Sequence, residues 1–196
     1  MTARAVSIRK IIISGAIAAF VGIIALVFYN FLAPEPLAPS GAGNPVDFDL
    51  LDPAYTNARL GFTLNPPKGW TIDESGQLGT FAVFVPKNPD ENNILTSLTV
   101  IVEPAEFLED YVRETRIRLP EILEDFTPLE NRRVSLGASE GHLIGGSFVF
   151  NGLPVRTLRL ITTKNNRGYD ITATALTSAW AGQRAAIEAA LLTFRP

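Results

Sequence analysis

The sequence contains no cysteine and a single histidine, His142. The absence of cysteine excludes disulfide bonds, thiolate metal sites, a cysteine nucleophile and a lipidated cysteine anchor. A zinc site normally needs several histidine or cysteine ligands, so one histidine argues against it. Basic residues are also few: 17 Lys and Arg face 20 Asp and Glu, which gives a net charge of −3. Nucleic-acid binding requires a concentrated basic surface, so we expect no nucleic acid among the partners.

One long hydrophobic run stands near the start of the chain. It begins at Ile11, ends at Leu32 (residues 11–32) and contains no charged residue. A helix needs about 20 apolar residues to cross roughly 30 Å of hydrocarbon, and this run is long enough. The run therefore predicts a single transmembrane helix, through which the chain is attached to the membrane.

The charges around this run predict its orientation. Arg4, Arg9 and Lys10 precede it, and acidic residues follow it. The positive-inside rule then places residues 1–10 in the cytoplasm and the rest of the chain outside the cytoplasmic (inner or plasma) membrane. A cleaved signal peptide is the alternative. It is disfavoured because the run exceeds the usual length of a signal-peptide core and because Ala38-Pro39-Ser40 is a poor cleavage site.

Residues 33–46, APEPLAPSGAGNPV, are rich in proline and glycine. Proline-rich chain extends by about 3.1 Å per residue, so this segment could reach roughly 40 Å. It predicts a stalk that holds a domain of residues 47–196 away from the bilayer.

The domain alternates between strand and helix patterns. Period-two alternation and β-branched residues predict seven strands, at residues 60–64, 81–85, 97–104, 132–136, 141–150, 155–163 and 169–176. Helical spacing predicts one helix over residues 106–119, broken or restarted by Pro120. A second helix is predicted from a capping Ser178 to about Leu192, followed by Phe194 as a core anchor.

Short turns between successive strands predict an antiparallel sheet. Several strands carry apolar residues on both faces, as Phe81 and Phe84 do in one strand. A sheet covered on one face only would alternate more cleanly. We therefore expect an α+β fold with about seven antiparallel strands and helices on both faces, an α/β/α sandwich.

Two stretches resemble a known family. YTNARLGFTLNPPKGW (residues 55–70) resembles the opening of PsbP-like domains: a Tyr, Gly-Phe, a strand, then Pro and Gly-Trp. GYDITATALTSAW (residues 168–180) and the following helix, which ends in a Thr-Phe pair, resemble the close of that domain. The resemblance covers residues 47–196 and implies a PsbP-like fold. Members of that family are extrinsic subunits that support photosystem II, and bacterial envelope proteins share their fold. The resemblance implies binding to a larger assembly and no enzyme activity.

Residues 137–141, GASEG, match the G-x-S-x-G pattern of serine hydrolases. That nucleophile elbow needs a strand before the serine and a helix after it. Here a strand pattern follows, so the stretch predicts a hairpin turn. His142 comes directly after the motif, whereas the hydrolase base arrives from a distant loop, so Ser139 is not expected to be catalytic.

Other polar groups have weaker claims to chemistry. The acidic clusters are Asp47, Asp49 and Asp52; Asp90 and Glu91; and Glu106, Glu109 and Asp110. None has an EF-hand pattern, and a loose Ca²⁺ site at the first cluster is the alternative to a solvated stretch. The alternation of charge sign predicts a solvated face for seven arginines: Arg113, Arg116, Arg118, Arg132, Arg133, Arg156 and Arg159. Trp70 and Trp180 are expected to anchor the core.

These observations predict no catalytic, cofactor-binding or metal-binding residues. The leading hypothesis is a non-catalytic, membrane-tethered extracytoplasmic domain that binds or stabilises a membrane or envelope protein complex, with photosystem association among the roles that the resemblance implies. The alternative hypothesis is an envelope sensor that binds a small molecule or Ca²⁺ in a pocket between sheet and helix.

Overall fold

The computed structural model describes residues 50, 53–74, 82–87 and 96–196. The predicted transmembrane helix and stalk lie outside these ranges, as do Asp47, Asp49, Asp52, Asp90 and Glu91. Within the described ranges, no helix is both long and apolar enough to cross a bilayer.

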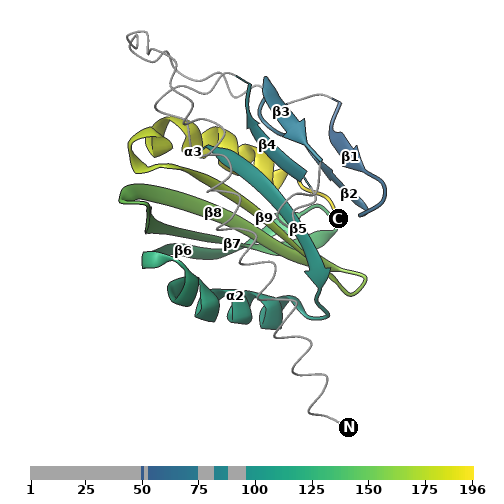
Figure 1. Ribbon diagram of the computed structural model, residues 1–196. Helices are drawn as coiled ribbons and strands as arrows, with labels where there is room; N and C mark the ends of the chain where they lie inside the picture. Colours follow the sequence, from purple (N-terminus) through teal and green to yellow (C-terminus); the bar gives the residue numbers. More distant parts are fainter. Residues whose placement is uncertain (1–49, 51–52, 75–81, 88–95) are drawn as a thin grey trace.

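The described chain forms a two-stranded sheet, a seven-stranded sheet and two helices (Figure 1). The strands are β1 (Tyr55–Asn57), β2 (Phe62–Leu64), β3 (Trp70–Asp73), β4 (Ala82–Pro86), β5 (Ser97–Pro104), β6 (Glu124–Leu136), β7 (Ser139–Phe150), β8 (Leu153–Lys164) and β9 (Arg167–Leu176). The helices are α2 (Leu108–Ile122) and α3 (Thr177–Leu192).

The main sheet is fully antiparallel and has the order β3-β4-β5-β9-β8-β7-β6. Strands β6 to β9 follow one another through three hairpins. Helix α2 then connects β5, beside β9, to β6 at the far edge (Figure 1). This arrangement confirms the predicted α+β fold with a seven-stranded antiparallel sheet.

The three hairpins that join β6, β7, β8 and β9 have two-residue loops. Asn151 and Gly152 both have positive φ, as do Asn165 and Asn166. Positive φ at both loop positions is the type I′ geometry, whose twist matches that of the flanking strands. At the β6–β7 loop only Gly137 has positive φ, which is typical of a type II′ turn. The hairpin turn predicted at residues 137–141 and the short turns predicted between the last three strands are thereby confirmed.

Alternating residues of each strand build two separate cores. On β8, Leu158 and Leu160 pack in the core that contains Ile187 of α3, whereas Ile161 packs in the core that contains Val112 of α2. Because successive side chains point to opposite faces of a sheet, the two helices cover opposite faces. The predicted arrangement of helices on both faces is therefore confirmed.

One predicted strand belongs elsewhere. Residues 60–64 do not join the main sheet: β2 pairs with β1, and Thr63 exchanges both backbone hydrogen bonds with Arg195. The ring of Phe62 stacks on Phe194 at 5.4 Å. Aromatic packing against the end of α3 holds β2 away from the sheet. Strand β3, which the sequence pattern did not indicate, takes the edge position instead.

Two details of the helices differ from expectation. Pro120 lies inside α2 and does not break it. The helix ends two residues later, at Ile122, so the proline affects only the last turn. Leu123 closes that turn by donating its N–H to the Leu119 carbonyl at 3.0 Å. Helix α3 begins at Thr177 directly after β9, so Ser178 lies within it and does not cap it. Phe194 is fully buried, as expected for an anchor.

Candidate functional site

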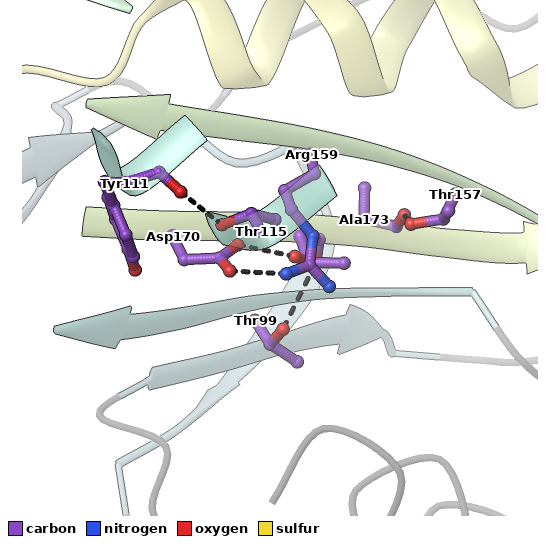
Figure 2. A network of polar contacts seen from close by, with 8 residues as sticks. Thr99, Tyr111, Thr115, Thr157, Arg159, Asp170 and Ala173 are labelled. Carbon is purple, nitrogen blue, oxygen red and sulfur yellow. Dashed lines mark hydrogen bonds and ion pairs between the residues drawn. The ribbon is translucent and has the colours of Figure 1, made fainter. Parts of the chain in front are cut away.

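A buried ion pair joins two central strands on the face that α2 covers. Arg159 on β8 and Asp170 on β9 are 5% and 7% exposed, and Nη1 lies 2.6 Å from Oδ2. The Thr172 hydroxyl donates to the other carboxylate oxygen, Oδ1, at 2.7 Å (Figure 2). The burial of Arg159 contradicts its expected place among the solvated arginines. Its strand, β8, lies between β9 and β7 inside the sheet. The position of the strand decides the burial of Arg159, and the alternation of charge along the sequence does not reveal that position.

A row of hydroxyl groups surrounds this ion pair. The row comes from β5, β8 and β9 and consists of Ser97, Thr99, Thr157, Thr172 and Thr174, all buried. Thr99 donates to the Thr172 carbonyl at 3.2 Å, and Thr157 donates to the Ala173 carbonyl at 3.0 Å (Figure 2). Ser97 and Thr174 share a hydrogen bond of 3.0 Å. Because these groups bond across neighbouring strands, the row acts as a structural network that keeps the sheet in register.

A second carboxyl group, that of Glu103, lies near the ion pair and interacts with Asp170 and Arg159. Burial raises the pKa of Glu103, while the nearby Tyr111 hydroxyl and the charges of two arginines oppose the shift. Burial also raises the pKa of Tyr111 well above its ordinary value, helped by the negative charges of Asp170 and Glu103. Burial thus makes Glu103 resist ionisation, and the positive charges of Arg118 and Arg159 only partly offset that effect.

The serine of the hydrolase-like motif does not meet the histidine. Ser139 begins β7 and pairs with Leu136 across the hairpin, so a strand follows the serine and no helix does. Gly141, two residues on, faces Leu160 of the α3-side core, and His142 faces Glu109 of α2. Ser139 shares the face of Gly141 by strand alternation, so Ser139 and His142 point to opposite faces of the sheet.

His142 occupies a polar junction between β6, β7 and α2. Its Nδ1 lies 3.3 Å from the Asn131 side-chain oxygen, and its Nε2 lies 3.6 Å from Glu109 Oε1. Glu109 also pairs with Arg133 at 2.7 Å. In the described part of the chain, no three His, Cys, Asp or Glu side chains gather closely enough to hold a metal ion.

Most other arginines lie at the surface, as the charge pattern predicts. Arg113 pairs with Asp110 at 2.6 Å, and Arg132 pairs with Glu188. Exposed pairs of this kind contribute about 0–1 kcal/mol to stability. Trp70 and Trp180 are partly buried and pack against the α3-side core. They therefore lie at the edge of the core, and neither is fully enclosed.

An open groove with a volume of about 550 Å³ lies between α2 and the edge strand β6. One wall is a stripe of α2 made by Arg113, Arg116, Ile117 and Pro120. The other wall comes from β6, with Phe126, Pro128, Leu129, Glu130 and Asn131, and the floor from Leu119 and Ile144. Of the large apolar side chains exposed in the described residues, Ile117 and Leu129 stand on opposite walls, at 59% and 50% exposure.

Two irregularities in β6 shape this groove. The register with β7 shifts by one residue between Glu124 and Thr127 and again between Pro128 and Glu130. Each shift is a β-bulge, which bends a strand and redirects its side chains. The bulges interrupt the period-two pattern, so residues 124–131 did not read as a strand in the sequence. The sequence feature that could have drawn attention to this segment was Pro128 followed by the apolar Leu129.

The sequence matches no protein-family model and no curated protein. Solved structures do share the fold. The solution structure of cyanobacterial PsbP (CyanoP) from Synechocystis sp. PCC 6803 superposes with a TM-score of 0.55 at 12% identity, over 80% of this chain and 97% of that one.

Two bacterial proteins are similar to a comparable degree. PA94 of Pseudomonas aeruginosa, a protein of unknown function and a putative regulator, superposes with a TM-score of 0.51 at 12% identity, over 75% of this chain and 96% of PA94. LpqN of Mycobacterium tuberculosis, which is involved in cell envelope biogenesis, superposes with a TM-score of 0.52 at 16% identity, over 68% of this chain and 82% of LpqN. At these identities the likeness shows a PsbP-like fold and carries no information about activity.

Proposed function

We propose that this chain is a single-pass membrane protein whose extracytoplasmic domain, residues 47–196, binds a membrane or envelope protein complex without catalysing a reaction. The observation that carries this proposal is the groove between α2 and β6, with two exposed apolar side chains on its walls. Exposed apolar side chains that face one another across a hollow are typical of protein-binding surfaces.

The rest of the domain supports binding in preference to chemistry. The buried charges of Arg159 and Asp170 pair with each other, and Ser139 and His142 lie on opposite faces of the sheet. The fold is also that of LpqN, a protein involved in cell envelope biogenesis. The apolar run of residues 11–32 and the proline-rich stretch of residues 33–46 would place this domain close to a membrane partner. Tethering raises the effective concentration of a weak binder near its target.

Crosslinking in intact membranes tests the proposal. The full-length chain would be crosslinked, extracted in mild detergent and analysed by mass spectrometry for proteins attached in constant stoichiometry. We expect one membrane or envelope complex to be recovered. A bare monomer after efficient crosslinking would refute the binding role.

The tether has a separate test with a matched control. In one variant an exported, cleavable signal replaces residues 1–32, and in the other an unrelated transmembrane helix replaces residues 11–32. We expect the released domain to fold and to lose most of the crosslinked complex, whereas the foreign anchor restores it. Full recovery of the complex by the released domain would refute the tethering proposal.

A small-molecule sensor is the second candidate function. A groove volume of about 550 Å³ falls within the range of about 300–1,000 Å³ that ligand pockets occupy. Thermal unfolding of the full-length protein against a panel of envelope metabolites and Ca²⁺ would test it. A ligand that raises the melting temperature, and whose effect disappears in Ile117→Asp, would support the sensor.

A further inference from the structure

The α2–β6 groove has an apolar centre. Ile117 projects from α2 and Leu129 from β6, and both are at least half exposed. Leu119 and Ile144, below them, are buried. An apolar side chain placed between the two walls would bury surface on Ile117 and Leu129 together, and burying such a side chain fully contributes about 1.5–3 kcal/mol.

The charge beside this apolar centre is positive and uncompensated. In the described part of the chain no carboxylate forms an ion pair with Arg116, although Arg113 pairs with Asp110 at 2.6 Å. Glu130, at the opposite wall, gives Oε2 to Arg184 at 2.7 Å. An incoming carboxylate can therefore reach Arg116 next to Ile117 without displacing an existing partner, and Arg suits a carboxylate because it can donate two parallel hydrogen bonds.

The shape of β6 decides how a partner can be held. β6 is an edge strand, and an edge can accept an additional strand through its free backbone groups. Pro128 and the two bulges interrupt that edge where it adjoins the groove, and such features block strand addition. A partner here must be held through its side chains.

Resting on the proposed binding function, we infer that the α2–β6 groove is the docking site for a peptide segment of the partner protein. The segment carries an apolar side chain that inserts between Ile117 and Leu129 and a neighbouring Asp or Glu that pairs with Arg116. The Arg116 guanidinium and the apolar centre of the groove select for acidic-apolar segments, and they disfavour basic segments.

Selection from a random peptide library tests this chemistry without knowledge of the partner. Peptides would be selected on the full-length protein in nanodiscs, and the affinities of the enriched peptides measured. We expect Asp or Glu close to Leu, Ile or Phe. Arg116→Glu should weaken these peptides about tenfold or more, and selection on that variant should no longer enrich acidic residues.

Lys87→Glu is the matched control, because it changes the net charge equally directly after β4, which is far from β6 in the strand order. It should change affinity less than about twofold, whereas Ile117→Asp should weaken binding about tenfold or more. Peptides without acidic residues, or equal losses in Arg116→Glu and Lys87→Glu, would overturn the inference.

Photo-crosslinking in membranes separates this inference from the function on which it rests. p-Benzoylphenylalanine would replace Ile117, Leu129 or, as a control, Lys87. Protein adducts from positions 117 and 129, with none from position 87, would support the groove as the docking site. A protein adduct from position 87 alone keeps the binding function and overturns the groove, and no adduct anywhere counts against both. Adducts to lipid at position 117 would assign the groove to the membrane surface and also overturn the inference.

Discussion

The ring of Phe126 on β6 lies against the backbone of Gly146 on β7: a Cβ atom on Gly146 would be 2.3 Å from Cε2 of that ring. The same arrangement recurs on the other face, where a Cβ on Gly145 would lie 2.6 Å from Cγ of Glu130. Two consecutive glycines thus let two β6 side chains pack flat on β7. Both of these side chains line the groove, so the glycine pair is part of its construction.

We predict that Gly146→Ala destabilises the protein by about 1–3 kcal/mol, because the added methyl group displaces the Phe126 ring. Gly182→Ala is the control. Gly182 lies in α3, and a methyl group added there would meet open space, so replacement should raise stability by about 0.5–1 kcal/mol. Urea unfolding followed by tryptophan fluorescence measures both changes. Equal effects of the two substitutions would contradict the steric explanation.

Local turn chemistry made the hairpins predictable from sequence. Asn151-Gly152 and Asn165-Asn166 adopt positive φ within two-residue loops, and these residue types tolerate that geometry. The change from period-two alternation to helical spacing at α2 and the apolar stripe of α3 were also visible in the sequence, because both are patterns of neighbouring residues. The α+β class and the sheet with helices on both faces followed from these patterns.

The candidate site was not predictable from local pattern. Ile117 and Leu129 belong to different elements, and their meeting depends on two bulges that set the register of β6 against β7. The burial of Arg159 likewise depends on the position of β8 within the sheet. Long-range pairing decided both features, so charge alternation and hydrophobic periodicity gave no signal for them.

The β8–β9 hairpin supplies a second prediction. Asn166, at the second loop position, has a φ of 59°, a region that glycine adopts without steric strain. Asn-Gly is a preferred type I′ pair, so Asn166→Gly should be neutral or slightly stabilising, whereas Asn166→Val should destabilise by about 1–2 kcal/mol. Thermal unfolding of the two variants provides the comparison. A Val variant as stable as the Gly variant would show that the loop changes its backbone conformation.

The buried ion pair supplies a third prediction. Asp170→Ala leaves the Arg159 guanidinium buried without its carboxylate, and breaking such a pair costs about 3–5 kcal/mol. Removing both charges in Arg159→Met with Asp170→Leu should recover much of that loss, because the desolvation penalty disappears with them.

The exposed pair of Arg133 and Glu109 is the control for this experiment. Both side chains are at least 60% exposed, so Arg133→Ala should cost no more than about 1 kcal/mol. Chemical unfolding of the single and double variants gives the values. If Asp170→Ala cost as little as Arg133→Ala, the ion pair would contribute nothing beyond a surface pair.

Glu103 supplies a prediction about pH. Its folded-state pKa is raised above the ordinary value of 4.5, chiefly by burial. Between pH 4.5 and that raised pKa, the folded protein binds more protons at this residue than the unfolded chain does. The contribution of Glu103 to the free energy of unfolding therefore falls as the pH rises through this window, and it stays low above it.

Glu103→Gln removes this titration while keeping a side chain of similar size. The variant should gain stability relative to the wild type as the pH rises from about 4.5, and the gain should level off once Glu103 ionises in the folded wild type. Tyr111→Phe should move that levelling to higher pH, because the Tyr111 hydroxyl lowers the pKa of Glu103. Urea unfolding at a series of pH values measures these differences. The stability difference between Glu103→Gln and wild type could instead be the same at about pH 4 and about pH 8. Glu103 would then ionise as readily in the folded protein as in the unfolded chain, and the burial of its carboxyl group would have no energetic consequence.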